Sequence, residues 1–267
     1  MKKVWVLVGK EWAEVFKNKM VLFSVAFMPL IFCIIPLVIL YTMQGATPAD
    51  ISGIEAELGA AFDQLRLQCG PLVELDCTQF LILQQFMVLF LMMPAIIPVT
   101  IASYSIVGEK NTHTLEPLLA TPITTGQLLA GKALAAAIPA VVASSASFLI
   151  FAGGTALLAA SPAVALQLFS PLWVLGIFLV GPLLSLAGVS LAVMISSRVN
   201  DPRAAEQLAV LVILPILALF LGQLAGVVVI NQGLLLIIAG ALVLVDAALL
   251  FFATRLFQRE SILTRWK

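Results

Sequence analysis

The chain has 267 residues, of which 62% are hydrophobic and only 10% are charged. This composition lies far outside the range of soluble globular proteins and predicts an integral membrane protein. The 14 basic and 14 acidic residues cancel. No basic stretch is interleaved with aromatic residues, so a nucleic-acid partner is not expected.

Residues 4–19 form the first predicted element, an amphipathic helix. Most of its large apolar side chains share one side of a helical wheel, with Leu7 as the exception; they are Val4, Trp5, Val8, Trp12, Val15 and Phe16. The charged side chains lie on the other side. Such a helix is expected to lie in the headgroup plane. It would act either as a plain membrane anchor or as part of a surface for a cytoplasmic partner, and the sequence leaves both open.

Six apolar segments follow, each long enough to cross about 30 Å of hydrocarbon as a helix. They are residues 20–43, 80–107, 133–160, 171–196, 208–230 and 234–254. Their continuous apolar runs lack the alternation of barrel strands. The predicted fold class is therefore an all-α integral membrane protein, with residues 1–267 forming a single transmembrane domain.

The basic residues predict the orientation of these helices. If all six segments cross, Arg66 is alone on one side, and the other 13 of the 14 basic residues share the side that holds both termini. Positive charge is retained on the cytoplasmic side of membrane proteins. We therefore expect both termini and the loop of residues 108–132 to be cytoplasmic, in a protein of the plasma membrane.

Residues 44–79 form the predicted external segment, which is acidic and has helical spacing of apolar residues over about 49–66. Cys69 and Cys77 lie at its end, on either side of a Gly-Pro turn. Outside the cytoplasm such a pair is readily oxidised, which predicts a disulfide between them. The alternative is two reduced thiols in a reducing habitat.

The cytoplasmic loop of residues 108–132 is patterned as a docking element. Leu115, Leu118 and Leu119 fall at i, i+3 and i+4, so a short helix would present them as one stripe, with Glu116 off that stripe. A Thr121-Pro122 turn follows. Thr124 and Gln127 then have the spacing of a capping box, which predicts the start of the next helix.

Two further features concern the second half of the chain. Asp201 before Pro202 is a good N-cap, so the fifth helix is expected to begin there. Asp246 is the only ionisable residue within the last apolar segment. A carboxylate at that depth should face protein or water. It is either a candidate ion site or proton relay on a translocation path, or a buried group hydrogen-bonded to a neighbouring helix.

Sequence motifs for chemistry are missing. No GxxxxGK[ST] phosphate-binding loop occurs, and the single histidine, His113, lies in the cytoplasmic loop. Zinc chemistry and Ser-His-Asp catalysis therefore lack the residues they need. We predict no catalytic residues, no metal site and no cofactor in this chain.

The loop GEKNTHTLEPLLATPITTGQLLAGK resembles the cytoplasmic loop of ATP-binding cassette (ABC) permeases of the type-2 export class. The family pattern is G-E-[KR], T-L-E-x-L-L, A-T-P and then G-K, and this chain matches it at Gly108, Glu109, Lys110, Thr114 to Glu116, Leu118 to Pro122, Gly131 and Lys132. The segment Ser196 to Arg203 and the six-helix layout also resemble that family.

The resemblance implies a half-transporter that pairs with a second copy or a close relative and with separate cytoplasmic ATPase subunits, which would hold the ATP and magnesium. It implies that Glu109, Thr114, Leu115, Glu116, Leu118 and Leu119 couple this chain to the ATPase. Two other classes stay open, an ATP-independent secondary transporter or channel and a membrane scaffold subunit. The substrate is not predicted beyond a preference for apolar or amphipathic cargo.

Overall fold

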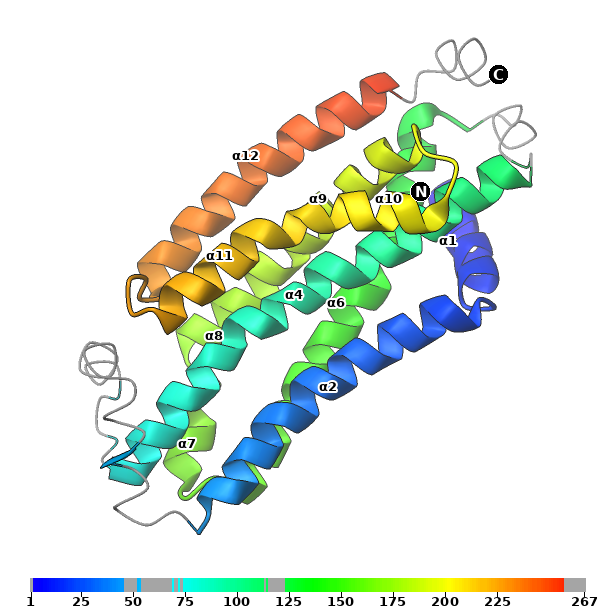
Figure 1. The fold of residues 1–267 in the computed structure, drawn as a ribbon. Coiled ribbons are helices and arrows are strands. Elements are labelled where there is room, and N and C mark those ends of the chain that lie inside the picture. Colours follow the sequence, from blue (N-terminus) through cyan, green and yellow to red (C-terminus); the bar gives the residue numbers. More distant parts are fainter. Residues whose placement is uncertain are drawn as a thin grey trace.

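The computed structural model describes residues 2–45, 52–53, 69, 72, 74–112, 114 and 123–256. Within these residues all regular structure is helical, and the helices form one elongated bundle (Figure 1). Six helical spans in the described residues are long and apolar enough to cross a membrane. The predicted all-α fold with six crossings is confirmed.

The first three crossings are single helices. The helix α1 (Lys2–Val15) precedes α2 (Lys19–Met43), α4 (Glu74–Asn111) and α6 (Thr125–Leu158). The helix α4 extends beyond the predicted segment 80–107 at both ends, and α6 begins before the predicted segment 133–160 and ends at Leu158. An apolar run marks only the part of a helix that lies in hydrocarbon. The predicted capping box starts α6: the Gln127 N–H donates to Thr124 Oγ1, and the Thr124 N–H donates to Gln127 Oε1.

The fourth crossing is built from several pieces. After α7 (Pro162–Gln167), the chain turns into α8 (Pro171–Leu175), a π-helical turn (Gly176–Val180) and α9 (Gly181–Ser196). Pro162 and Pro171 each stand at the start of a helix, where a missing N–H is harmless. The π-helical turn lies between Gly176 and the Gly181-Pro182 pair, which is a common setting for a break in regular α-helix.

The fifth crossing begins at the predicted N-cap and ends earlier than predicted. It consists of α10 (Pro202–Ala209), a 3₁₀ turn (Val210–Val212) and α11 (Ile213–Leu224). The Asp201 side chain accepts a hydrogen bond from the Arg203 N–H. The predicted end at residue 230 is wrong, because Gly226 adopts a left-handed conformation with φ 69° and stops the helix. The last crossing is α12 (Gln232–Leu256).

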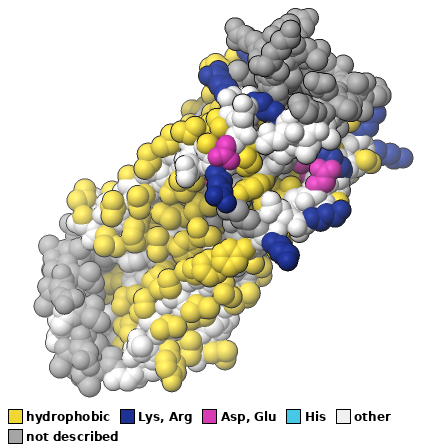
Figure 2. Space-filling model, turned by 45° about the vertical axis from the view of Figure 1, so that its right-hand side comes forward, with side chains coloured by type: hydrophobic (Ala, Val, Ile, Leu, Met, Phe, Trp, Pro, Cys, Tyr) yellow, Lys and Arg dark blue, Asp and Glu magenta, His cyan; other side chains and the backbone are white. Residues whose placement is uncertain are grey.

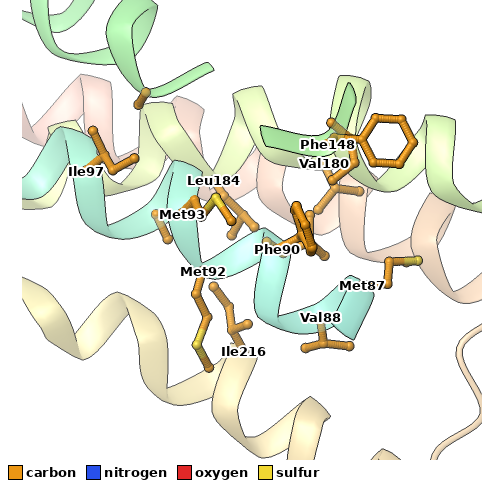
Figure 3. Packing of buried hydrophobic residues seen from close by; sticks show 14 of the residues in the cluster. Met87, Val88, Phe90, Met92, Met93, Ile97, Phe148, Val180, Leu184 and Ile216 are labelled. Carbon is orange, nitrogen blue, oxygen red and sulfur yellow. The ribbon is translucent and has the colours of Figure 1, made fainter. Parts of the chain in front are cut away.

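The core lies around α4 and α9. Most of α4 is buried, whereas α2, α11 and α12 bury few of their residues and present apolar side chains outward. Phe90 of α4 packs against Phe151 and Trp173, and Phe148 stacks on Trp173. Figure 3 shows Phe90 and Met93 of α4 among residues from the surrounding helices. Exposed apolar side chains on the outer helices are the expected covering for a lipid-facing surface.

The two ends of the bundle differ in charge. Lys and Arg side chains gather at one end, while hydrophobic side chains cover much of the face toward the other end (Figure 2). We call the first the basic end; it is formed by α1, the end of α4 and the starts of α6 and α10 (Figure 1). At the opposite end a disulfide joins Cys69 to Cys77, with their Cα atoms 5.4 Å apart.

Candidate functional site

Three helices meet at the basic end, where α1 lies against the start of α6 and the end of α4 (Figure 1). Gly131 of α6 permits this close approach. A Cβ atom added to Gly131 would lie only 2.5 Å from Cδ2 of Leu7. A larger residue at position 131 would therefore displace the Leu7 side chain from its place between the two helices.

The face of α1 that packs on protein carries Leu7, Val8, Glu11 and Val15. Leu7 is buried although the helical wheel left it off the predicted apolar side, while Trp5 is 56% exposed and free to face lipid. Trp12 Nε1 donates a hydrogen bond of 2.9 Å to the Ala135 carbonyl of α6. The buried face of α1 thus includes part of the predicted apolar side together with Leu7, and it contains a carboxylate.

That carboxylate belongs to a buried network of charges. Lys132 Nζ lies 2.9 Å from Glu11 Oε1 and 2.7 Å from Glu109 Oε2, and all three side chains are at most 4% exposed. Lys132 also donates to Ser105 Oγ at 2.8 Å, and Ser105 in turn donates to Glu11. Gly131 and Lys132 are the G-K pair of the motif, and both contact α1. Gly131 leaves space for the Leu7 side chain, and Lys132 forms an ion pair with Glu11.

Lys10 closes the network from the more exposed side of α1. Its Nζ lies 2.5 Å from Glu109 Oε1 and 3.2 Å from Glu14. Two lysines thus share the carboxylate of Glu109. We call the set of Lys10, Glu11, Ser105, Glu109 and Lys132 the charge joint.

The joint favours the charged forms of Lys10 and Glu11. Burial alone would lower the pKa of Lys10, but the hydrogen bond to Glu109 and the nearby carboxylates raise it to about 12. Burial alone would raise the pKa of Glu11, but the charge of Lys132 and the hydrogen bonds from Ser105 and Lys132 hold it below its usual value. Lys10 and Glu11 therefore stay charged through the physiological pH range.

Glu109 also connects the joint to the loop that follows α4. The Thr114 N–H donates to the Glu109 carbonyl at 3.1 Å, and the Thr112 N–H donates to the Gly108 carbonyl at 3.0 Å. These bonds satisfy carbonyls at the end of α4. The side chain of Glu109 thus binds α1 and α6, while its main chain binds the first part of the loop.

A cleft of about 270 Å³ opens beside the joint. Its walls come from α1, from the end of α4 and from the start of α10; they include Glu14, Tyr104, Glu109, Thr114 and Pro202. Polar groups line the cleft at the point where the chain leaves α4 for residues 115–122.

Apart from the disulfide at the opposite end, the predicted site residues fall into three groups. Glu109 and Thr114 meet at the basic end. Leu115, Glu116, Leu118 and Leu119 lie outside the described residues, as do His113 and most of the segment 44–79. Asp246 lies apart, on the buried stripe of α12 that also carries Leu235, Ala239 and Ala253. Its side chain is buried, and neither carboxylate oxygen has a hydrogen-bond partner among the described residues.

Sequence reasoning missed the roles of Lys10, Glu11, Ser105 and Lys132. One signal was present: Leu7, Glu11 and Val15 recur at intervals of four, which puts a carboxylate in the middle of an apolar helix face. A glutamate in such a position requires a buried partner. Lys132, the only charged residue near the start of the third apolar run, was the available candidate.

Comparison with known protein families matches residues 5–261 to the ABC-2 family transporter proteins. A search of curated proteins found no match. The match covers nearly the whole chain, including α1, all six crossings and the charge joint. Together with the six apolar helices it identifies a multi-pass membrane protein. The chain belongs to the ABC-2 transporter family and is a permease component of an ABC transporter.

Proposed function

We propose that this chain is the permease subunit of an ATP-driven exporter and that separate ATPase subunits move it from the basic end. ATP and magnesium are bound, and ATP is hydrolysed, in those partners. The loop of residues 108–132 is the docking element, with Leu115, Leu118 and Leu119 seated in the ATPase and Glu116 at the rim. The basic end then faces the cytoplasm, and the protein resides in the plasma membrane with both termini inside.

The observation that supports this most is the position of Glu109. Its main chain binds Thr114 in the loop, and its side chain binds Lys10 and Lys132. A pull on the loop would therefore reach α1, α4 and α6 together. Separating the partners of a buried ion pair costs several kcal/mol of free energy. The three helices would therefore move as a unit.

A second copy of the chain, or a close relative, completes the translocation path in this proposal. The outer helices α2, α11 and α12 present apolar faces that a second copy and lipid would cover. Asp246 remains a candidate group on that path, because it is buried and its carboxylate has no hydrogen-bond partner in the part of the chain that the structure describes.

The test is coupled ATP hydrolysis. We expect the chain to co-purify with an ATPase whose hydrolysis rate rises when the chain is present. Leu118→Asp should abolish that stimulation, since a carboxylate cannot be buried in an apolar groove. Lys17→Asp, which adds a carboxylate at an exposed position of the same end, is the matched control and should keep the stimulation.

Glu109→Gln tests the connection itself. The amide keeps the shape but loses the charge that two lysines share, so the complex should still assemble while the stimulated hydrolysis falls several-fold. Undiminished stimulation in folded Leu118→Asp protein would overturn the docking assignment. A chain that transports or assembles with no ATPase attached would favour the secondary-transporter or scaffold alternatives.

A further inference from the structure

A second cavity, of about 190 Å³, lies between α2, α4 and α10. It is lined by Phe23, Phe27, Met28, Ile96, Ile97, Thr100 and Glu206. Phe23 and Phe27 are 59% and 42% exposed as residues, so the mouth of the cavity opens beside α2 on the outside of the bundle. A molecule in the adjacent leaflet of the membrane could enter from that side.

The cavity contains one charge. Glu206 Oε1 accepts a hydrogen bond of 2.5 Å from Thr100 Oγ1, and Thr100 is buried in α4. Thr100 lies 11 residues before the end of α4 at Asn111, or about 16 Å along the helix. Among the described residues no cation pairs with Glu206, in contrast to the carboxylates of the charge joint. Thr100 satisfies one carboxylate oxygen of the half-buried Glu206, while the negative charge of Glu206 stays uncompensated beside a mostly apolar wall.

The rest of the wall suits the apolar part of such a cation. Phe23 and Phe27 are stacked, with ring centroids 4.6 Å apart, and aromatic faces attract cations. Met28 supplies an adaptable apolar contact. Pockets of this composition, mostly apolar with a few polar groups that fix orientation, are typical of small-molecule sites.

The same wall excludes other ligand classes. Calcium and magnesium need about six oxygen ligands, and here the side chains offer one carboxylate and one hydroxyl. Glu206 repels anions. A neutral apolar molecule would leave the carboxylate unpaired.

We propose that this cavity binds an organic cation with apolar or aromatic substituents, with Glu206 as its counter-charge and the Phe23–Phe27 pair as its aromatic wall. As a substrate site the cavity rests on the transport function proposed above. Binding of the cation does not depend on that function, so it can be tested on the purified chain alone.

The probe is benzyltrimethylammonium, titrated calorimetrically into the purified chain in lipid nanodiscs, with empty nanodiscs as the blank. Its neutral isostere, neopentylbenzene, carries carbon in place of the charged nitrogen. We expect saturable binding of the cation by the wild-type chain and at least tenfold weaker binding by Glu206→Gln. The amide can still accept the Thr100 hydrogen bond, so the variant should fold. Any binding of neopentylbenzene should be equal in the two proteins.

Glu14→Gln removes a carboxylate outside this cavity and should bind the cation as the wild type does. Phe27→Leu should weaken binding several-fold, while Phe252→Leu, at an exposed position of α12, should not. Equal affinity for the cation in wild type and Glu206→Gln, or heat no greater than that of empty nanodiscs, would overturn the proposal. Because no ATPase or nucleotide is present, failure here leaves the docking proposal standing, and failure of docking leaves this result standing.

Discussion

Buried carboxylates are handled in opposite ways in two regions of this molecule. At the basic end, Glu11 and Glu109 lie 2.9 Å and 2.7 Å from the same lysine, and a serine and a second lysine complete their contacts. In α12, Asp246 is as deeply buried but neither oxygen has a partner among the described residues. The first region joins three helices, and the second leaves a carboxylate without a hydrogen-bond partner in the described part of the chain.

This difference separates buried charges that stabilise the fold from a buried charge that is a candidate for function. A charge joint whose members are matched stabilises one arrangement of α1, α4 and α6, so its loss should first be seen as lost stability. An unmatched carboxylate adds nothing to the stability of the single chain. Any function of Asp246 would therefore involve a ligand, a proton or a second chain.

The largest effect is expected from Lys132→Met. The change leaves Glu11 and Glu109 buried without their shared cation, which costs about 3–5 kcal/mol for a buried pair. We expect a strong drop in the thermal unfolding temperature of the detergent-purified protein and release of α1 to protease. Lys17→Met, at an exposed position, should unfold at the wild-type temperature. Similar unfolding temperatures for the two variants would show that the joint carries little stability.

The pH dependence of stability should reveal the same joint with a smaller effect. The pKa of Glu11 is lower in the folded chain than its ordinary value of 4.5, so the unfolded state binds the proton more readily. The stabilisation from Glu11 is therefore complete above about pH 4.5 and is lost as the pH falls through the lower folded value. We expect the unfolding temperature of the wild type to fall more steeply under acid than that of Glu11→Gln.

Lys10 sets the other limit of the pH window. Its pKa is raised from 10.5 to about 12, so its contribution is complete below pH 10.5 and is lost as the pH rises through 12. Lys10 is 34% exposed, and solvent screening keeps this contribution small.

The acid experiment has its own contradicting outcome. Superimposable curves of unfolding temperature against acid pH for the wild type and Glu11→Gln would contradict the assignment of Glu11 to the joint.

The smallest effect on stability is expected from Asp246→Asn. Because the carboxylate has no hydrogen-bond partner to lose among the described residues, a neutral amide of the same shape should leave the unfolding temperature unchanged or slightly raised. Transport by the assembled complex is the informative readout, and a loss of transport would support a role on the path. Full transport in this variant ends the functional claim for Asp246. A marked fall in the stability of the assembled complex would instead reveal that the second chain supplies a partner for this carboxylate.

Much of the fold could be predicted from sequence because hydrocarbon imposes a simple rule on apolar runs. That rule located all six crossings, and turn and cap chemistry located the starts at Thr124 and Asp201. It failed at the end of the fifth crossing, where Gly226 stops the helix inside an apolar run. Hydrophobicity cannot reveal a backbone conformation, so the end at residue 230 was wrong.

The site was less predictable, for a physical reason. The motif located Glu109 and Lys132 near the membrane surface, but their ion pairs require α1 to pack on α6 through Leu7 and Gly131. That contact joins residues more than a hundred positions apart, and helical periodicity describes only neighbours in the chain. The docking leucines stay a prediction, since they lie outside the described residues.

The central claim is that an ATPase seats on the loop at the basic end, and site-specific photo-crosslinking tests it most directly. A photoreactive residue placed at position 118 in the assembled complex should crosslink to the ATPase subunit. The same residue at position 236, an exposed position of α12 toward the opposite end, should not. An intact complex in which position 118 gives no ATPase crosslink, or in which position 236 does, would contradict the account.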